Sequence, residues 1–293
     1  MTGEIRDVVV LTNPTAGRGR ALRVRDEALP RLRGAGWRVR PITGRNADDA
    51  AELGRKALAD GADALLVCGG DGMVNLGLQL VAGTEVPLGI LPAGSGNDVA
   101  RYLGIPRRDG AAAAAHLLGA SPTPIDLARV GERYFATVLA AGFDAVVSER
   151  ANRMRWPRGQ MRYNLATLAE LRAFSPRTYR LDLDGAELHT RATLVAVGNG
   201  PSFGGGLRIA EGADLHDGLL DVVVIRPLTR PDLVRTYPKL FRGTHVHHPQ
   251  YERHRVTRVT VAAPDIVGYA DGERFGALPL TVESVPSAIR VLA

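Results

Sequence analysis

Hydrophobic and polar positions between Asp7 and Leu118 follow a pattern that predicts strands alternating with helices. Short apolar runs have the length of buried strands, and the segments between them carry apolar residues at helical spacing. Such alternation is typical of a parallel sheet that helices cover on both faces. The predicted strands are Val8–Leu11, Trp37–Ile42, Ala64–Cys68 and Leu88–Leu91, and the predicted helices are Arg20–Gly34, Asp48–Ala59, Val74–Ala82, Asp98–Leu103 and Asp109–Leu118.

The pattern changes near Ser121–Pro124. Strand-like runs separated by Asp-Gly turn signals follow, and two helical segments interrupt them. We therefore expect an α/β domain over residues 1–121 and a larger, antiparallel β-rich domain of sandwich-like α+β type over residues 122–293. The second domain's predicted turns are Asp184-Gly185, Asp217-Gly218 and Asp271-Gly272, its helices Met161–Phe174 and Pro231–Phe241, and its strands Ile125–Val130, Tyr134–Ala140, Tyr179–Leu183, Ala192–Val197, Leu219–Ile225, Val256–Ala262, Ile266–Ala270, Leu280–Val285 and Ile289–Leu292.

The chain of 293 residues has room for roughly two domains. Its single cysteine, Cys68, excludes an internal disulfide and suits a reducing cytoplasm. Since Cys68 ends an apolar run, we expect a buried, inert thiol. The sequence enters a strand-like run at Val8–Leu11 and has no apolar stretch of the roughly 20 residues that a membrane span needs. We therefore expect no signal peptide and only peripheral membrane contact.

The formal net charge is +6, and nearly all of the positive charge is arginine. Two interpretations are open: base composition and solubility, or attraction to nucleotide phosphates or acidic lipid head groups. Aromatic residues make up only 5% and no basic–aromatic recognition motif stands out, which argues against nucleic acid as a partner. The stretch Arg150–Tyr163 interleaves arginines with Trp156, a mixture that suits a membrane interface but also a segment that covers a core.

Two glycine-rich turns follow consecutive predicted strands. Gly69–Gly72 comes after Leu65–Cys68, and Pro92–Asp98 comes after Pro87–Leu91. A strand, a glycine-rich turn and a helix N-terminus together let backbone N–H groups approach a phosphate, so two such units predict a nucleotide held from two sides. Asp71 in the first turn fits beside an anion only with a bridging cation, which predicts an element that binds Mg²⁺ and phosphate.

A third loop, Asn13–Gly17, follows the first predicted strand. Ligands of open α/β sheets bind beyond the carboxyl ends of the strands, so we expect this loop to share an edge with the two glycine-rich turns. No GxxxxGK[ST] motif is present, which excludes a P-loop enzyme. No GxGxxG opens a helix with a suitable acidic residue downstream, so the dinucleotide fingerprint is missing as well.

These motifs, in this order and spacing, resemble the diacylglycerol kinase catalytic-domain family, specifically its soluble bacterial lipid kinases. The resemblance extends over nearly the whole chain, which makes it strong although each motif alone is weak. The segments that carry it are Asn13–Gly17, Gly69–Gly72, Pro92–Arg101, Ile125-Asp126, Ala141–Asp144, Gly198–Gly200, Asp217–Asp221 and Asp271–Glu273.

The resemblance implies a two-domain kinase with its active site in the cleft between the domains, ATP as phosphoryl donor, Mg²⁺ as cofactor and a lipid hydroxyl as acceptor. Diacylglycerol giving phosphatidate is the default reaction. Glu273, in the family's DGE motif, is then the general base and Asp71 a second catalytic residue, and a carboxylate is suited to take the proton of a weakly nucleophilic alcohol. The residues implied in nucleotide binding are Asn13, Pro14, Thr15, Ala16, Gly17, Thr43, Gly69, Gly70, Asp71, Gly72, Met73, Asn75, Gly94, Ser95 and Asn97.

The resemblance also implies a structural Mg²⁺ in the second domain. Its ligands would be the carboxylate of Asp217 and the backbone carbonyls of Asp214 and Leu219, which suffices because Mg²⁺ takes few protein ligands and keeps its waters. An aspartate network around the metal and the domain junction would comprise Asp71, Asp98, Asp126 and Asp217.

One residue departs from the family's usual GGDGT motif, because Met73 stands where the threonine is expected. A hydroxyl at a helix N-terminus can cap the helix or donate to a phosphate, and methionine can do neither. We therefore expect weakened ATP affinity or an altered choice of nucleotide.

Three alternatives to a diacylglycerol kinase stay open. The acceptor could be a sphingoid base, a ceramide or another lipid alcohol. NAD kinase shares GGDG and a related nucleotide-binding fold, although Pro92–Arg101 and the Asp271-Gly272-Glu273 motif fit it poorly. A non-catalytic nucleotide- or lipid-binding relative is favoured only by Met73.

The expected partners are a diacylglycerol-like membrane lipid and a membrane surface reached peripherally from the cytoplasm. A homodimer is left open, and no nucleic acid is expected.

A predicted polar connection carries a cluster of four histidines, where we expect a surface loop and not a metal site. The four are His245, His247, His248 and His254.

Overall fold

The computed structural model describes residues 5–142 and 176–293. The chain divides into two compact units. The first comprises Met1–Asp126 together with Pro286–Ala293, and the second comprises Leu127–Val285. The predicted helix Met161–Phe174 and the basic–aromatic stretch Arg150–Tyr163 lie outside the described residues.

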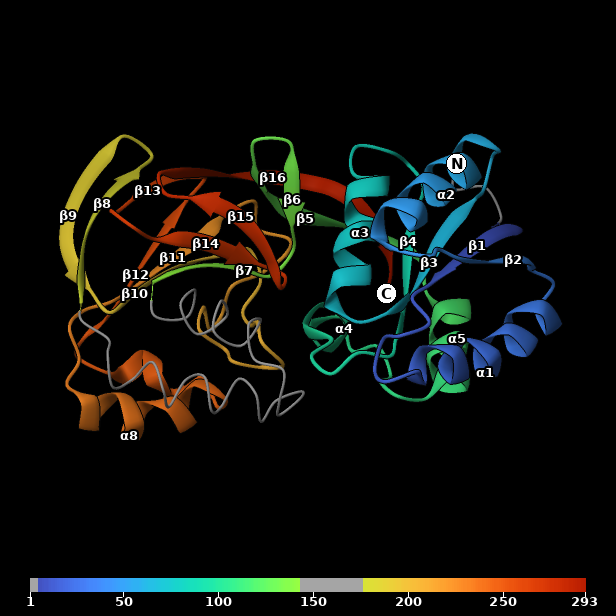
Figure 1. Ribbon diagram of the computed structural model, residues 1–293, viewed down its shortest axis with the longest axis horizontal. Coiled ribbons are helices and arrows are strands. Elements are labelled where there is room, and N and C mark those ends of the chain that lie inside the picture. Colours follow the sequence, from blue (N-terminus) through green and yellow to red (C-terminus); the bar gives the residue numbers. More distant parts are fainter. Residues whose placement is uncertain (1–4, 143–175) are drawn as a thin grey trace. The chain divides into compact units, whose positions relative to one another are not determined.

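The sheet of the first unit is parallel. In Figure 1 its strands lie between two helices on one face, α1 and α5, and two on the other, α2 and α3. The order is β2-β1-β3-β4, with the end of β16 beside β4. The bounds are β1 (Asp7–Thr12), α1 (Arg20–Gly34), β2 (Arg38–Thr43), α2 (Ala47–Ala59), β3 (Ala64–Gly69), α3 (Asp71–Val81), β4 (Leu88–Pro92), α4 (Asp98–Tyr102), α5 (Gly110–Gly119) and β16 (Leu280–Leu292). The predicted helix-covered parallel sheet is confirmed.

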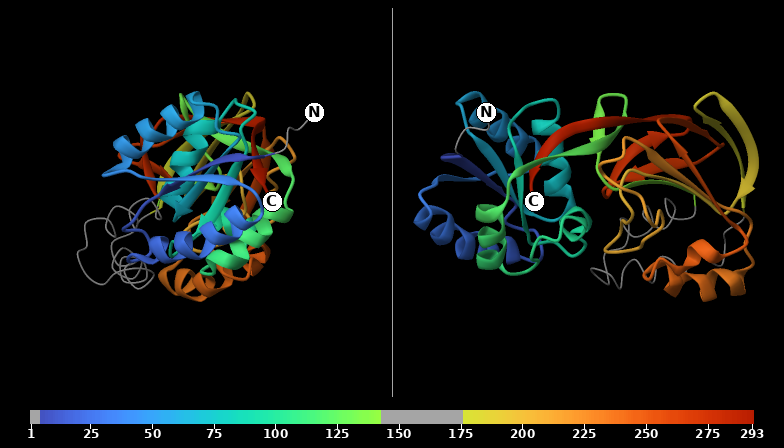
Figure 2. Two further views of the ribbon diagram at one scale, coloured as in Figure 1. Left: turned by 90° about the vertical axis from the view of Figure 1, so that its right-hand side faces the viewer. Right: turned by 180° about the vertical axis from the view of Figure 1, so that it is seen from behind.

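The central strands β3 and β4 have every residue buried. Helices on both faces remove both sets of alternating side chains from water, which is why these strands read as continuous apolar runs. The final strand was not assigned to this sheet by its sequence pattern, yet Val291 lies opposite Leu88 in parallel. Figure 2 shows the chain's red C-terminal end among the strands of the first unit.

The second unit contains an antiparallel sheet with the order β12-β11-β10-β7-β14-β15. A further antiparallel group joins β16 to β13, β13 to β8 and β8 to β9, and β5 pairs with β6. The bounds are β5 (Pro122–Val130), β6 (Arg133–Phe135), β7 (Val138–Gly142), β8 (Arg177–Leu183), β9 (Ala186–Ala192), β10 (Leu194–Gly198), β11 (Leu220–Ile225), α8 (Arg230–Leu240), the 3₁₀ helix η1 (Thr244–His247), β12 (Tyr251–Val256), β13 (Arg258–Ala262), β14 (Val267–Ala270) and β15 (Glu273–Ala277). The expected antiparallel, sandwich-like domain is confirmed.

Alternating residues of the antiparallel strands feed two separate cores. Val222 and Val224 of β11 pack with Val259 and Val261 of β13 between the two strand groups. Val223, which points to the opposite face, packs in a smaller core with Ile209, Ala210 and Leu240. This period of two is the expected geometry of a strand whose two faces are both covered.

Three strands were missed by the sequence pattern, namely β9, β12 and β15. Their residues are mostly polar and exposed or half-buried, since β9, β12 and β15 stand at sheet edges. Edge strands have one side without a partner strand, so their sequences carry charges instead of an apolar run. The predicted strands Leu280–Val285 and Ile289–Leu292 are in fact one continuous strand, β16.

The histidine cluster is only partly a surface loop, so that expectation is corrected. His245 is 1% exposed in η1, where its Nε2 lies 3.1 Å from the carbonyl oxygen of Ile209. Burial lowers the pKa of the His245 imidazole. His254 lies in strand β12. In the part of the chain that the structure describes, no helix is both long and apolar enough to span a bilayer.

Candidate active site

Three loops meet at the carboxyl edge of the first unit's sheet. Because parallel strands end at the same edge, the loops after β1, β3 and β4 are neighbours there. The backbone N–H of Asn13 donates to the carbonyl of Cys68 at 3.1 Å, and that of Ala93 donates to the carbonyl of Gly69 at 2.7 Å. The structure therefore brings together the three motif loops that the sequence singled out.

Glycine is required where these loops touch. A Cβ on Gly17 would lie 2.0 Å from the carbonyl oxygen of Ala93, and Gly17 also has a φ of +58°. A Cβ on Gly94 would lie 2.4 Å from the Cα of Gly70. Such distances are far below a van der Waals contact, so a side chain at either position would push the loops apart. The edge consequently presents backbone to a ligand.

Two of the helices that begin at this edge, α1 and α3, carry no side-chain cap. The residue before each helix is a glycine, Gly19 before α1 and Gly70 before α3, and glycine has no side chain that could accept from the first N–H groups. By contrast, Asn46 caps α2 and Asp109 caps α5, both through carbonyl or carboxylate oxygens. Backbone carbonyls accept from the N–H groups of Ala21 and Met73, so the other N–H groups of these first turns are the candidates to bind an anion, which the positive end of each helix also attracts.

Asp71 joins the starts of two helices. Its Oδ2 accepts from the backbone N–H of Asn97 at 3.0 Å, and its Oδ1 accepts from that of Asp98 at 2.8 Å. Each carboxylate oxygen keeps a second lone pair, so these bonds leave Asp71 able to coordinate a cation. A Cβ on Gly96 would lie 2.5 Å from Oδ2 of Asp71 and 3.3 Å from Oδ2 of Asp98, which places both carboxylates beside Gly96. One or two carboxylates completed by substrate phosphates are a usual protein environment for Mg²⁺.

Several other predicted nucleotide residues shape the loops themselves. The side chain of Asn97 both accepts from the N–H of Gly94, at 2.9 Å, and donates to its carbonyl, at 3.0 Å. The Oδ1 of Asn13 accepts from the N–H and from the hydroxyl of Thr15, at 3.0 and 2.8 Å. Ser95 is exposed in the middle of the loop between β4 and α4, and Thr43 is exposed at the end of β2, whereas Asn75 is buried within α3.

Met73 lies inside the first turn of α3 and is 7% exposed. A Cβ on Gly69 would lie 2.5 Å from its Cγ, so the thioether chain packs on the backbone at the end of β3. The predicted helix started at Val74, but α3 begins at Asp71 because the residues of the glycine-rich turn already have helical geometry. Met73 therefore fills space beneath the loops, where a threonine would be shorter.

In the second unit, Asp271 and Gly272 form a tight turn between β14 and β15. Both have positive φ, 52° and 85°, as a two-residue hairpin with the twist of its strands requires. The carboxylate of Asp271 accepts from the backbone N–H groups of Ala136 and Thr137, at 3.0 and 3.1 Å, and from the Thr137 hydroxyl. These bonds fix the turn against the segment between β6 and β7.

Asn199 holds the same segment from its other side. Its side-chain amide donates to the carbonyl of Ala136 at 3.1 Å, and its backbone N–H donates to that of Thr137 at 2.9 Å. Asn199 belongs to the Gly198–Gly200 motif, but no residue near it in the sequence predicts its contact with Ala136. Phe143 and Asp144, which end the motif begun by Ala141, lie outside the described residues.

Glu273 follows this fixed turn as the first residue of β15 and is exposed. Its carboxylate forms no hydrogen bond or ion pair with any residue in the ranges 5–142 and 176–293. The backbone that carries it is therefore held firmly while the carboxylate itself stays open to a ligand. An accessible carboxylate on a fixed turn can take a proton from a bound alcohol.

The predicted metal ligand Asp217 is engaged by a cation of the protein. Its Oδ1 accepts from the N–H of Leu219 at 2.9 Å, and its Oδ2 pairs with the Arg255 guanidinium. Arg253 extends the network by pairing with buried Asp221 and donating to the carbonyl of Gly212 at 3.2 Å. An ion beside Asp217 would face the Arg255 charge, so this donor set fits Mg²⁺ poorly.

Within residues 5–142 and 176–293, no three His, Cys, Asp or Glu side chains converge as a metal site. Arg255 could not be linked to Asp217 from the sequence, since strand pairing brings them together across a long separation.

Cys68 behaves as expected: it is buried, its Sγ lies 3.2 Å from the carbonyl of Ala21, and burial raises the pKa of its thiol to about 12.

Comparison with known proteins gives a consistent result. Residues 7–130 match the diacylglycerol kinase catalytic domain, and residues 137–293 match the YegS C-terminal NAD kinase beta sandwich-like domain. A diacylglycerol kinase of Mycobacterium tuberculosis (strain CDC 1551 / Oshkosh) is 45% identical over 99% of this chain and 96% of that protein. A diacylglycerol kinase of Bacillus subtilis (strain 168) is 27% identical over 92% of this chain and 90% of that protein.

A solved structure shares the fold over nearly the full length. The crystal structure of a Bacillus anthracis str. Sterne protein superposes with a TM-score of 0.81 at 22% identity, covering 99% of this chain and 98% of that one. Both parts of the architecture are thus matched, and the resemblance seen in the sequence is confirmed. On these grounds the chain belongs to the diacylglycerol kinase family of lipid kinases.

Proposed function

We propose that this chain transfers the γ-phosphoryl group of ATP to the hydroxyl of a membrane lipid, with diacylglycerol as acceptor and phosphatidate as product. The observation that carries the proposal is the carboxyl edge of the first unit's sheet, where α1 and α3 begin without side-chain caps beside touching glycine loops. Such an edge offers N–H donors to phosphate oxygens and lets a polyphosphate approach the backbone closely.

The phosphates are bound by the N–H groups at the starts of α1 and α3. Asp71 and Asp98 are the carboxylates that would hold Mg²⁺ with the nucleotide, since both lie beside Gly96. When bound, the cation supplies positive charge to the β- and γ-phosphate oxygens. The hydrogen bonds from Asn97 and Asp98 to Asp71 keep that carboxylate in place before the nucleotide arrives.

Glu273 is the general base of the proposed reaction. As the lipid oxygen forms its bond to the γ-phosphorus, the hydroxyl proton passes to the Glu273 carboxylate. The bond between the γ-phosphorus and the β,γ-bridging oxygen breaks, and ADP leaves with that electron pair. Asp271 positions the base by fixing its turn on Ala136 and Thr137.

Diacylglycerol is chosen as acceptor because a relative with 45% identity over nearly its full length is named a diacylglycerol kinase. The acceptor resides in a membrane and ATP is a cytoplasmic metabolite. We infer that the chain works at the cytoplasmic surface of a membrane, without spanning it.

The proposal is tested by following the γ-phosphate of labelled ATP into a panel of acceptors. The panel holds diacylglycerol, monoacylglycerol, ceramide and sphingosine in mixed micelles, with NAD as a soluble acceptor, each with Mg²⁺ or a chelator. Label in phosphatidate that requires Mg²⁺ is expected. Label in another lipid would keep the reaction and change the acceptor, and label in NADP would contradict a lipid kinase.

The role of Glu273 is tested in the same assay with Glu273→Gln. The turnover number should fall at least about 100-fold, because general-base catalysis contributes roughly that much or more. The dissociation constant for ATP should stay unchanged. Glu132→Gln is the matched control, since Glu132 is also an exposed glutamate that follows a glycine in a hairpin turn of the second unit. Full turnover by Glu273→Gln would refute the assignment.

A further inference from the structure

Helix α8 turns apolar side chains outward. Val234 is 59% exposed and Phe241, at the end of the helix, is 41% exposed. Seven positions separate them, close to two helical turns, so both lie on one stripe. Tyr237 lies between them and its ring packs edge-on against Phe241, with centroids 5.7 Å apart. The stripe is therefore continuous and partly aromatic.

Three basic side chains, Arg235, Lys239 and Arg242, lie along one side of this stripe. Residues 230–242 hold four basic residues, Arg230, Arg235, Lys239 and Arg242, against one acidic residue, Asp232, which gives a local charge of +3 (4 − 1). Arg235 approaches Asp232 no closer than 3.9 Å, and its side chain is 78% exposed. Lys239 and Arg242 form no ion pair with any residue in the described ranges.

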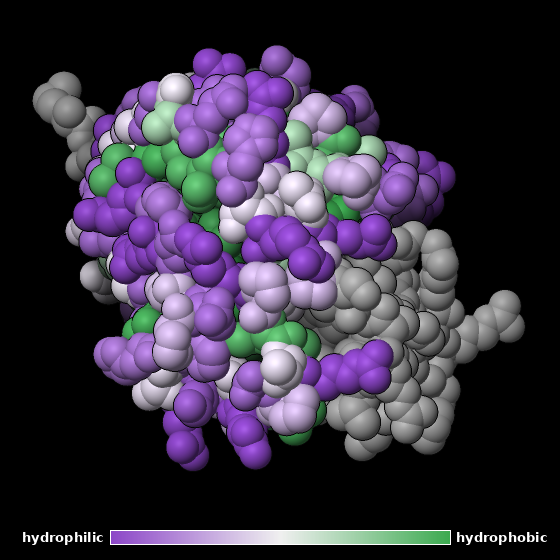
Figure 3. All heavy atoms as spheres, turned by 90° about the vertical axis from the view of Figure 1, so that its left-hand side faces the viewer, coloured by the Kyte–Doolittle hydropathy of each residue, from purple (hydrophilic) through white to green (hydrophobic). Residues whose placement is uncertain are grey.

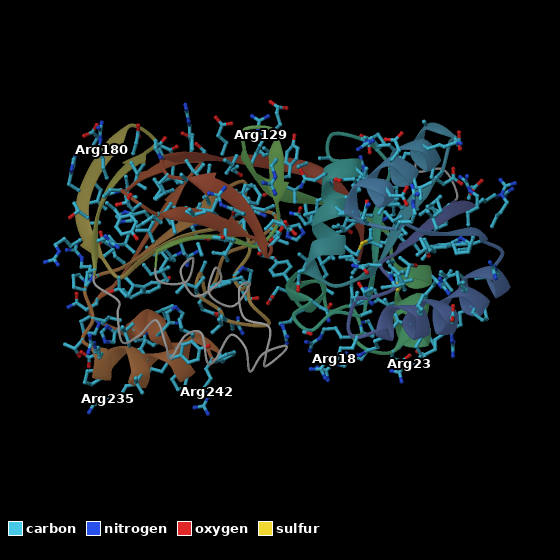
Figure 4. The ribbon with its side chains drawn as sticks, in the orientation of Figure 1. Arg18, Arg23, Arg129, Arg180, Arg235 and Arg242 are labelled. Atoms are coloured by element: carbon cyan, nitrogen blue, oxygen red, sulfur yellow. The ribbon has the colours of Figure 1, made fainter. Side chains whose placement is uncertain are left out.

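The figures show how this charge is presented. In Figure 4, Arg235 and Arg242 project from the α8 segment away from the strands of the second unit. In Figure 3, the lower part of the face, at the level of α8, mixes hydrophobic and hydrophilic surface.

The fold does not need the stripe for its own core. Within α8 only Thr236 is buried, and Leu240 anchors the helix on the smaller core of the second unit. The N-terminus is closed by Thr229, whose hydroxyl accepts from the N–H of Asp232 at 3.3 Å. A helix that served only to cover the core would turn Val234 and Phe241 toward it. Their outward placement is thus unexplained by folding.

We propose that α8 is the membrane-docking element of this chain and that its partner is an anionic phospholipid surface. Helices that lie in the membrane interface combine an apolar, often aromatic face with lysine and arginine on the polar face. Val234 and Phe241 would enter the head-group boundary, while Arg235, Lys239 and Arg242 would reach lipid phosphates. The inference rests on the proposed lipid acceptor but assigns a surface that the reaction itself does not define.

Docking is measured by sedimentation with vesicles, without nucleotide or diacylglycerol. The probes are vesicles of phosphatidylcholine alone and of phosphatidylcholine with about one third phosphatidylglycerol. The full chain should sediment with the anionic vesicles only. Each basic side chain near such a surface strengthens binding roughly fivefold, so Arg235→Glu with Arg242→Glu should weaken it by more than about tenfold. Val234→Ser with Phe241→Ser should weaken it to a similar extent.

Matched variants separate α8 from the overall charge and from exposed apolar surface in general. Arg177→Glu with Arg191→Glu changes the net charge equally at exposed positions of β8 and β9, and Leu22→Ser removes another exposed apolar side chain. Both should sediment like the unchanged protein. Phe241→Trp adds a direct reporter, whose emission should shift to shorter wavelength with anionic vesicles.

The outcomes that would overturn the proposal are specific. Sedimentation lost equally in the β8–β9 variant would show a general charge effect, and no sedimentation of the unchanged protein would show no docking. A dimer that Phe241→Ser abolishes in analytical ultracentrifugation, without vesicle binding, would assign the stripe to a second copy of the chain. Turnover of a short-chain, water-soluble diacylglycerol tests the kinase separately, and the α8 variants should keep it.

Discussion

Asp271 accepts two hydrogen bonds from Thr137, one from its backbone N–H and one from its hydroxyl. A second turn of the chain repeats this arrangement. Asp184, with a φ of 52° like Asp271, accepts from the N–H and hydroxyl of Thr257, both at 2.9 Å. Each aspartate is followed by glycine, but the next residue is Glu273 in one turn and Ala186 in the other. The same structural device therefore occurs once with a candidate base and once without.

Comparing the Asp271 turn with the Asp184 turn distinguishes a role in positioning Glu273 from a role in stabilising the fold. In Asp271→Asn the residue still tolerates positive φ, but an amide N–H₂ replaces one acceptor oxygen in front of buried donors. We expect the free energy of unfolding to fall by about 1–3 kcal/mol and lipid phosphorylation to fall at least about tenfold. Asp184→Asn should also lose stability in urea but keep its turnover number. Equal activity in the two variants would show that Asp271 does not position Glu273.

The contact between Gly94 and Gly70 predicts the effect of a single methyl group. In Gly94→Ala the new Cβ would meet the Cα of Gly70 at 2.4 Å, so the two loops must separate. We expect the dissociation constant for ATP, measured by calorimetry, to rise about tenfold or more, with a loss of stability of about 1–3 kcal/mol. Gly119→Ala is the control, because nothing lies within 4 Å of a Cβ there. Unchanged ATP binding by Gly94→Ala would show that the contact between Gly94 and Gly70 is not needed for phosphate binding.

We predict that Met73 stabilises the fold through its packing but binds ATP more weakly than a threonine at this position would. Met73→Thr places a hydroxyl in the first turn of α3 and should lower the dissociation constant for ATP several-fold, by about one hydrogen bond. It also removes a buried chain that packs on Gly69, so stability should fall by about 1–3 kcal/mol. Met73→Val has nearly the shape of threonine without the hydroxyl. Calorimetry with all three proteins isolates the hydroxyl, and equal affinity in the Thr and Val variants would contradict its role.

The ion pair between Arg255 and Asp217 predicts how Mg²⁺ affects stability. The guanidinium already neutralises the carboxylate, so without nucleotide the unfolding temperature should be the same in Mg²⁺ and in chelator. In Arg255→Ala the carboxylate is released, and Mg²⁺ should then raise the unfolding temperature. Arg226→Ala, which breaks an exposed pair with Glu252, should show no such gain. Stabilisation of the unchanged protein by Mg²⁺, abolished in Asp217→Asn, would instead support the structural metal site.

The features that the sequence could predict are those encoded locally. The strands around Leu65–Cys68 and Leu88–Leu91 are apolar because both faces are covered, and the glycine turns follow them directly. The Asp271-Gly272 turn can likewise be predicted from the sequence, because this dipeptide is favoured where two successive residues have positive φ angles. The fold class and the convergence of the three loops follow from these signals.

The features that could not be predicted depend on pairing over long distances. Asn199 reaches Ala136, and Arg255 reaches Asp217, only after the sheets have formed. Burial of His245 depends on how η1 packs, whereas the polar residues next to it in the sequence predict an exposed side chain. Strand β12 is polar because it is an edge, so its sequence lacks the apolar run by which strands are recognised.

The place of β16 constrains how the chain can be made. Val291 pairs with Leu88, so the sheet of the first unit is completed by residues that are synthesised only after the whole second unit, Leu127–Val285. Until they emerge from the ribosome, β4 has an open edge that exposes unpaired N–H and C=O groups to other nascent chains. The sheet of the first unit therefore cannot be completed before the second unit has been synthesised, and a chain truncated before β16 would lack a strand in each of its two units.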